Sequence, residues 1–151
     1  MIPERRRYFA AGIIARRTKK GYRFLVQVSE ETKGPTAGKK QLKFPGGMDS
    51  LKDNGNPEKT LRSEIEEETG YRIKDEASPI LLFSDKTGDI DRYFYLIHKV
   101  DCVGARRKKL VRDGSTILYP PVWTDLEYIR GRLHPTHLPA LRCLPTGGLA
   151  S

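Results

Sequence analysis

Residues 56–71 of this 151-residue chain read NPEKTLRSEIEEETGY, and this stretch predicts one helix with well-marked ends. Asn56 followed by Pro57 is typical of a helix start, because the Asn side chain caps free N–H groups and the proline needs no donor there. Gly70 is typical of a helix end, since glycine readily takes the left-handed conformation just past the last turn. The sequence therefore predicts a helix of about three and a half turns.

One face of this helix is acidic. Glu64, Glu67 and Glu68 stand at positions i, i+3 and i+4 and share that face, whereas Leu61 and Ile65 form a neighbouring apolar stripe that can pack on a core. Like charges at this spacing cost a few tenths of a kcal/mol each, so a group outside the helix should neutralise them. A hard divalent cation such as Mg²⁺ does so well. Taken alone, the acidic run is also typical of a solvated helix face.

A glycine turn precedes the helix, in residues 44–48, which read FPGGM. Gly46 and Gly47 allow the backbone to approach a ligand closely, and a carbonyl of either residue is a candidate oxygen ligand. The Pro-Gly-Gly turn, the two helix ends and the spacing of the glutamates together favour a metal site over a solvated helix face.

These residues resemble the box of the Nudix hydrolases, written G-x5-E-x7-R-E-U-x-E-E-x-G-U, where U is a bulky apolar residue. Residues 64–71, EIEEETGY, match its last eight positions, and residues 45–47, PGG, match the Pro-Gly-Gly that usually opens it. Two positions differ. The box arginine is replaced by Ser63, and counting back from Glu64 puts the first box glutamate at Gly55, in a stretch two residues longer than usual. In the family that arginine holds a catalytic glutamate; here Arg62, Lys43 and Arg72 are candidates to replace it.

The resemblance implies an α+β fold, a Nudix-like α/β/α sandwich with a mixed β-sheet. It implies Mg²⁺- or Mn²⁺-dependent hydrolysis of a pyrophosphate bond in a nucleoside diphosphate linked to another group. The catalytic residues would be Glu64, Glu67 and Glu68, which would also bind metal. Further metal-ligand candidates are Gly46, Gly47 and a late acidic residue, for which Asp113 is the nearest match; Lys43 is a candidate phosphate contact.

Two other hypotheses stay open. The differences at Ser63 and Gly55 are also compatible with a Nudix-fold module that binds a nucleotide or RNA without hydrolysing it. A small basic nucleic-acid-binding protein with a merely structural acidic helix is the second alternative. The resemblance implies that specificity lies in the loops at 29–40 and 101–115.

Composition sets the outer limits. The chain carries 28 Lys and Arg against 19 Asp and Glu, a net charge of +9, which favours a polyanionic partner. Nucleotide, RNA and inositol pyrophosphate all satisfy that charge, and the basic runs at 16–20 and 106–109 do not choose between them. Two cysteines do not make a disulfide framework, so a reducing cytoplasm is expected. No apolar run is long enough to span a bilayer, and a homodimer is left open.

Hydrophobic periodicity predicts one domain over residues 1–151, with an ordered core at about 8–145 and a frayed tail at 146–151. Expected strands cover 8–15, 22–28, 41–44, 79–84, 92–100 and 116–119. A second helix is expected over 123–130, with Thr124 and Glu127 as a capping box. His134 and His137 are expected in a loop, because Pro135 breaks a helix there.

Overall fold

The structure, a computed structural model, describes residues 6–145, so the predicted tail at 146–151 lies outside the described residues. Its centre is β1 (Tyr8–Thr18), which is buried almost throughout its first eight residues. β1 pairs in parallel with β7 (Asp91–His98) and antiparallel with β2 (Gly21–Glu31) and β4 (Gly46–Met48). The sheet is therefore mixed, as the sequence predicted.

The sheet is extended on both sides of β1. Its main path runs β6-β7-β1-β2-β10-β9, and β3 and β11 also pair with β2. The remaining strands of this sheet are β3 (Lys40–Lys43), β6 (Ile80–Asp85), β9 (Val111–Asp113), β10 (Thr116–Leu118) and β11 (Val122–Thr124). A small separate ladder joins β5 (Tyr71–Ile73) to β8 (Cys102–Gly104). Short 3-10 turns occupy η1 (Leu51–Asp53), η2 (Lys99–Asp101) and η3 (Pro135–His137).

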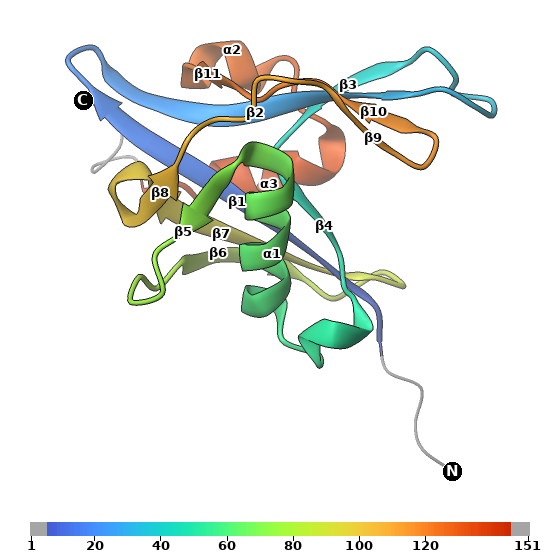
Figure 1. The fold of residues 1–151 in the computed structure, drawn as a ribbon, viewed down its shortest axis with the longest axis horizontal. Helices are drawn as coiled ribbons and strands as arrows, with labels where there is room; N and C mark the ends of the chain where they lie inside the picture. The colour runs from blue at the N-terminus through green and yellow to red at the C-terminus, as the bar shows by residue number, and fades with distance from the viewer. Residues whose placement is uncertain (1–5, 146–151) are drawn as a thin grey trace.

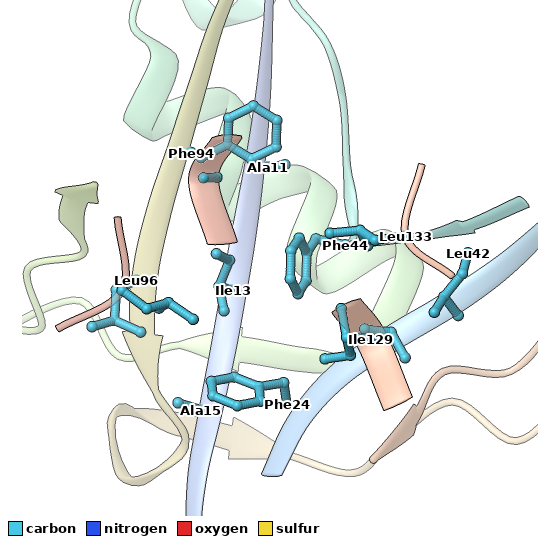
Figure 2. Close-up of a cluster of buried hydrophobic side chains, with 13 residues drawn as sticks. Ala11, Ile13, Ala15, Phe24, Leu42, Phe44, Phe94, Leu96, Ile129 and Leu133 are labelled. Atoms are coloured by element: carbon cyan, nitrogen blue, oxygen red, sulfur yellow. The ribbon is translucent and has the colours of Figure 1, made fainter. Parts of the chain in front are cut away.

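Helices cover both faces of the sheet. α1 (Pro57–Thr69) packs on one face, where Leu61 and Ile65 join a buried cluster with Ala10 and Ile14 of β1. α2 (Leu126–Arg130) and α3 (Leu138–Arg142) close the other face, in a cluster that takes the alternate residues of β1 (Figure 2). Figure 1 shows α1 in front of β1, on the opposite side of the strand from α3. The predicted α/β/α sandwich is confirmed.

Gly12 of β1 determines how closely α1 approaches the sheet. A Cβ at this position would lie 2.7 Å from Cδ1 of Ile97 and 2.9 Å from Cδ1 of Ile65. The absence of a side chain therefore lets α1 and β7 pack against the strand in the same place. The predicted ends of α1 are also confirmed: Asn56 accepts hydrogen bonds from the N–H groups of Glu58 and Lys59, and Gly70 has φ 85°.

The predicted second helix is wrong at its start. Trp123 and Thr124 belong to β11, where Trp123 pairs with Leu25 of β2. The helix begins only at Leu126, and its cap is Asp125, whose carboxylate accepts from the N–H of Tyr128 at 2.8 Å. Strand pairing with β2 therefore overrides the capping-box pattern. Among the described residues, no helix is both long and apolar enough to cross a membrane.

The predicted loop at 134–137 contains the 3-10 turn η3, and His137 is buried at 4% exposure. Its ring lies among Phe9, Phe44 and Phe94, and its Nδ1 accepts from the N–H of Phe44 at 3.2 Å. Burial, with the nearby charges of His134, Lys43 and Arg92, lowers the pKa of His137 to about 3. The imidazole is therefore neutral in the folded protein at neutral pH.

This burial predicts a pH-dependent term in stability. Below pH 6.5 the unfolded chain protonates His137 while the folded protein does not, so the free energy of unfolding falls as pH drops from 6.5 towards 3. The term is at most about 1.4 kcal/mol per pH unit. The raised pKa of Glu64 acts in the opposite direction, so the difference between wild type and His137→Leu isolates the histidine.

Urea denaturation at pH 7, 6, 5 and 4 measures this difference. Wild type is expected to lose about 1 kcal/mol per pH unit relative to His137→Leu between pH 6 and pH 4. Parallel curves for the two proteins would show that His137 is not held neutral.

Candidate active site

A cavity of about 400 Å³ opens where α1, β4 and β9–β10 meet. α1 and β4 lie side by side in Figure 1, and their facing residues form one wall. We call it the acidic cavity, because four of the residues that line it carry carboxylates: Glu31, Glu64, Glu68 and Asp113. Its polar and glycine lining includes Lys43, Gly46, Gly47, Glu64, Glu68 and Asp113. Six of the seven predicted site residues therefore lie around one space.

Glu68 is the most tightly held of these residues. Its side chain is 8% exposed, and its Oε1 accepts from the N–H of Gly46 at 3.0 Å and from Nε2 of Gln27 at 2.5 Å. Burial raises the pKa of Glu68, while the Gly46 N–H, Lys43, Gln27 and Arg107 act to lower it. Its Oε2 makes no hydrogen bond within the described residues. The carboxylate is thus fixed at one oxygen and free at the other.

Glu64 lies one turn earlier on the same helix face and packs directly on the glycine turn. A Cβ at Gly47 would lie 2.5 Å from Cδ of Glu64, so only glycine leaves room for this carboxyl group. Burial raises the pKa of Glu64 to about 7, and the negative charges of Glu68, Glu67 and Asp113 add to the effect. The cavity therefore holds more negative charge than its surroundings neutralise.

Glu67 is placed differently. Its side chain is exposed and lies 3.8 Å from Nζ of Lys52, outside the residues that line the cavity. Asp113 reaches the cavity from β9, opposite α1, and is exposed. In residues 6–145, no three His, Cys, Asp or Glu side chains gather closely enough to hold a metal ion by themselves.

Arg107 was not among the basic residues predicted to hold a glutamate of α1, yet it contacts Glu68 directly. Its Nε donates to the carbonyl of Glu68 at 2.7 Å, and its other nitrogens donate to the carbonyl of Tyr119 at 3.1 Å and to Oε1 of Gln27 at 3.5 Å. It also bonds to the carbonyls of Leu118 and Lys109. Its own N–H donates to the carbonyl of Thr69 at 2.6 Å.

Arg62 and Arg72, two of the residues predicted to replace the box arginine, do not contact Glu68. Arg62 donates to the carbonyls of Lys74 and Ala77, and Arg72 pairs with Asp75; both are directed away from Glu68. Lys43 is close enough for its charge to lower the pKa of Glu68, but it makes no hydrogen bond to it within the described residues.

Asp53 is a second residue that the sequence reading missed. Its side chain is 2% exposed, its Oδ2 accepts from Oγ1 of Thr60 at 2.7 Å, and its Oδ1 is buried without a hydrogen-bond partner. Its charge also raises the pKa of Glu64. Counting forward from Gly47 by the G-x5-E spacing reaches Asp53, so a carboxylate does occupy that position. The two extra residues follow it, where Asn54 and Gly55 take positive φ and form a tight turn.

Solved structures share this architecture. MutT, from work on the fish pathogen Aliivibrio salmonicida and on Vibrio cholerae, superposes with a TM-score of 0.66 at 16% identity, covering 91% of this chain and 95% of that one. The NUDIX domain of Shewanella oneidensis NrtR, complexed with ADP ribose, gives a TM-score of 0.63 at 14% identity over 90% and 84%. This chain has the Nudix fold.

A third neighbour comes from the complex between the C-terminal domain of mouse MUTYH and human PCNA, at a TM-score of 0.58 and 15% identity over 92% of this chain and 87% of that one. Identities this low show the fold alone. No protein-family model and no curated protein sequence matches the chain.

Arg107 contacts Glu68, although it does not occupy the arginine position of the box pattern. The box position is Ser63 on α1 itself, whereas Arg107 comes from the segment after β8 and reaches the same glutamate through its backbone carbonyl and through Gln27. The signal in the sequence was the basic run 106–109, which resembles a solvated loop. Arg106, the first residue of this run, also makes a contact within the protein, because it donates to the carbonyl of Pro121 at 2.7 Å.

Arg107→Lys is expected to lower the free energy of unfolding by about 2 kcal/mol. Lysine keeps the charge but loses the planar fork that bonds several carbonyls at once, and hydrogen bonds to a charged donor contribute about 1.5–3 kcal/mol. Arg112→Lys, on the exposed β9, is the matched control and should change stability by about 0.5 kcal/mol or less. Urea denaturation of both variants decides the point; equal losses would contradict a special role for Arg107.

Proposed function

We propose that this protein is a metal-dependent pyrophosphohydrolase of the Nudix type, which cleaves a pyrophosphate bond in a nucleoside diphosphate linked to another group. The observation that carries the proposal is the convergence of Glu64, Glu68 and the Gly46–Gly47 turn on one cavity. Although the protein has a net charge of +9, Glu64 and Glu68, whose pKa values burial raises, lie together there. Perturbed carboxylates that share a cavity are characteristic of a functional site.

The donor set fits Mg²⁺ or Mn²⁺. These ions take oxygen ligands, and the cavity offers the carboxylates of Glu64, Glu68 and Asp113 beside the backbone of Gly46 and Gly47. Because the pKa of Glu64 is raised to about 7, a proton and a metal cation compete for its carboxylate near neutral pH. Glu67 would join by leaving Lys52, and an exposed ion pair of this kind contributes little to stability.

A divalent ion bound there supplies Lewis-acid stabilisation of phosphate charge and a water of lowered pKa. The residues of the chain do the positioning. The Gly46 N–H and Gln27 hold Oε1 of Glu68, which leaves Oε2 to bind or to accept a proton. Lys43 at the rim of the cavity adds positive charge for phosphate oxygens. We do not divide metal binding and proton transfer between Glu64 and Glu68, because closely coupled carboxylates titrate together.

The substrate class takes support from a neighbour. The NUDIX domain of NrtR holds ADP ribose, a nucleoside diphosphate linked to a second group, and this chain resembles it over 90% of its length. A cytoplasmic location and Mg²⁺ or Mn²⁺ as the physiological ion belong to the same proposal.

Glu68→Gln and Glu64→Gln test the activity. Each removes one negative charge at nearly constant shape, and we expect kcat to fall at least about a hundredfold, the lower end of what an acid–base or metal-binding carboxylate contributes. Glu66→Gln, on the exposed far side of α1, is the matched control and should keep full activity. Phosphate release from nucleoside diphosphate derivatives, dinucleoside polyphosphates and triphosphorylated RNA, with and without Mg²⁺ or Mn²⁺, is the measurement.

Undiminished rates in both variants would refute the site. Metal-independent binding of these ligands with no product formed would favour the alternative of a non-catalytic nucleotide- or RNA-binding module.

Gly47→Ala tests the packing of Glu64 on the glycine turn. The added methyl group would occupy the space of the Glu64 carboxyl, and Gly47 does not have a positive φ, so the fold should tolerate the change. We expect a loss of kcat of about tenfold or more, since an ångström of misplacement can cost about a hundredfold. Gly131→Ala, where a Cβ meets nothing within 4 Å, is the control. Equal rates for the two variants would contradict this placement of Glu64.

A further inference from the structure

A second cavity, of about 210 Å³, adjoins the acidic one and has the opposite electrostatic character. The two share Phe9, Lys43 and Met48 in their linings. We call it the basic cavity. Lys43, Arg92, His134 and His137 are among the residues that line it, and the described residues of its lining include no Asp or Glu.

Both histidines of the basic cavity carry an N–H that can donate to a ligand. Nδ1 of His137 accepts from the N–H of Phe44, so the neutral ring carries its proton on Nε2. Nδ1 of His134 accepts from the N–H of Thr136 at 3.2 Å, which likewise leaves Nε2 as the protonated nitrogen. His137 is 4% exposed, and its Nε2 has no partner within the described residues. Because His137 lines the cavity and its Nε2 makes no hydrogen bond to the described residues, this N–H can donate to a ligand that accepts hydrogen bonds.

The two cations of the cavity form no direct ion pair within the described part of the chain. Lys43 and Arg92 take part in no ion pair among residues 6–145, and both lower the pKa values of His134 and His137. Asp85 is opposite Arg92 in the β6–β7 ladder, but its carboxylate accepts from the N–H and Oγ1 of Thr87. Asp91, the neighbour of Arg92, pairs with Arg6.

We propose that the basic cavity binds a second anionic group of the substrate, a phosphate monoester carried beyond the diphosphate that is cleaved. The inference rests on the proposed function, because it takes the acidic cavity as the place of the diphosphate. Lys43, which lines both cavities, then lies between the two anionic groups. Two cationic side chains and two histidine N–H donors around one cavity without a carboxylate in its described lining are groups that recognise phosphate.

The three histidines of the chain make a direct binding test practicable. His134 and His137 line the cavity, whereas His98 ends β7, six residues or about 20 Å along the strand from Arg92. Inorganic phosphate is titrated into the protein in EDTA, so that no metal takes part, and the imidazole resonances are followed by NMR. We expect saturable shifts of His134 and His137 with His98 unchanged.

Arg92→Gln should weaken this phosphate binding at least tenfold. Lys20→Gln removes the same charge from the exposed β1–β2 turn and should leave the affinity unchanged. In the metal-dependent assay, Arg92→Gln should raise KM with little change in kcat, because Arg92 lies away from the acidic cavity.

Three results would overturn the proposal. These are equal phosphate affinities for Arg92→Gln and wild type, uniform unsaturable shifts of all three histidines, or saturable shifts with adenosine that Arg92→Gln leaves unaffected, which would mark a nucleobase pocket. Phosphate binding without any metal-dependent hydrolysis would instead overturn the proposed activity and leave the anion site standing. Hydrolysis without phosphate binding in the basic cavity would do the reverse.

Discussion

The buried carboxylate of Glu68 is the group on which the surrounding structure depends. A carboxylate at 8% exposure is costly by several kcal/mol unless hydrogen bonds and opposite charge compensate it. The compensation comes from β4 through the Gly46 N–H and from β2 through Gln27. Arg107, from the segment after β8, adds its charge and binds the backbone of the same residue. Segments distant in sequence therefore meet at one side chain, and the fold and the candidate site share the same stabilising contacts.

Arg107 also explains how α1 can end beside its own acidic face. The last carbonyls of a helix have no partners within it, and that end carries a partial negative charge. Arg107 donates to the carbonyls of Glu68 and Thr69 and brings a positive charge to the place where the helix most needs one. The same segment leads into β9, which carries Asp113 to the cavity. Because Arg107 and Asp113 belong to one segment, the contacts of Arg107 couple the position of Asp113 to the position of Glu68.

The sequence predicted the features that depend on one segment of the chain, but not the contacts between distant segments. The helix α1, its caps and the common face of Glu64 and Glu68 follow from spacing within one segment, and the structure has them. Gln27 and Arg107 lie 41 and 39 residues from Glu68, so no local pattern indicated them. Asp53 was missed because the count ran back from the helix through the two inserted residues.

Tertiary contacts overruled local patterns in two other places. The cap predicted at Thr124 failed because β2 pairs with that segment, and strand pairing is not visible in a capping motif. His137 was expected in a loop, but the aromatic rings of β1, β7 and the segment before the glycine turn enclose it. Both outcomes depend on residues far away in the chain.

The net charge of +9 favours a polyanionic partner but does not locate its site. In the basic run 106–109, Arg106 and Arg107 bind backbone carbonyls, and in the 16–20 run Arg16 lies 4.6 Å from the ring centroid of Trp123. These cations act within the fold. Lys43 and Arg92 belong to neither run, yet β3 and β7 bring them together in one cavity beside the acidic one. An anion is attracted to one side of Lys43 and a cation to the other, so the two cavities together favour a ligand that carries phosphate across both, with a metal ion on one side only.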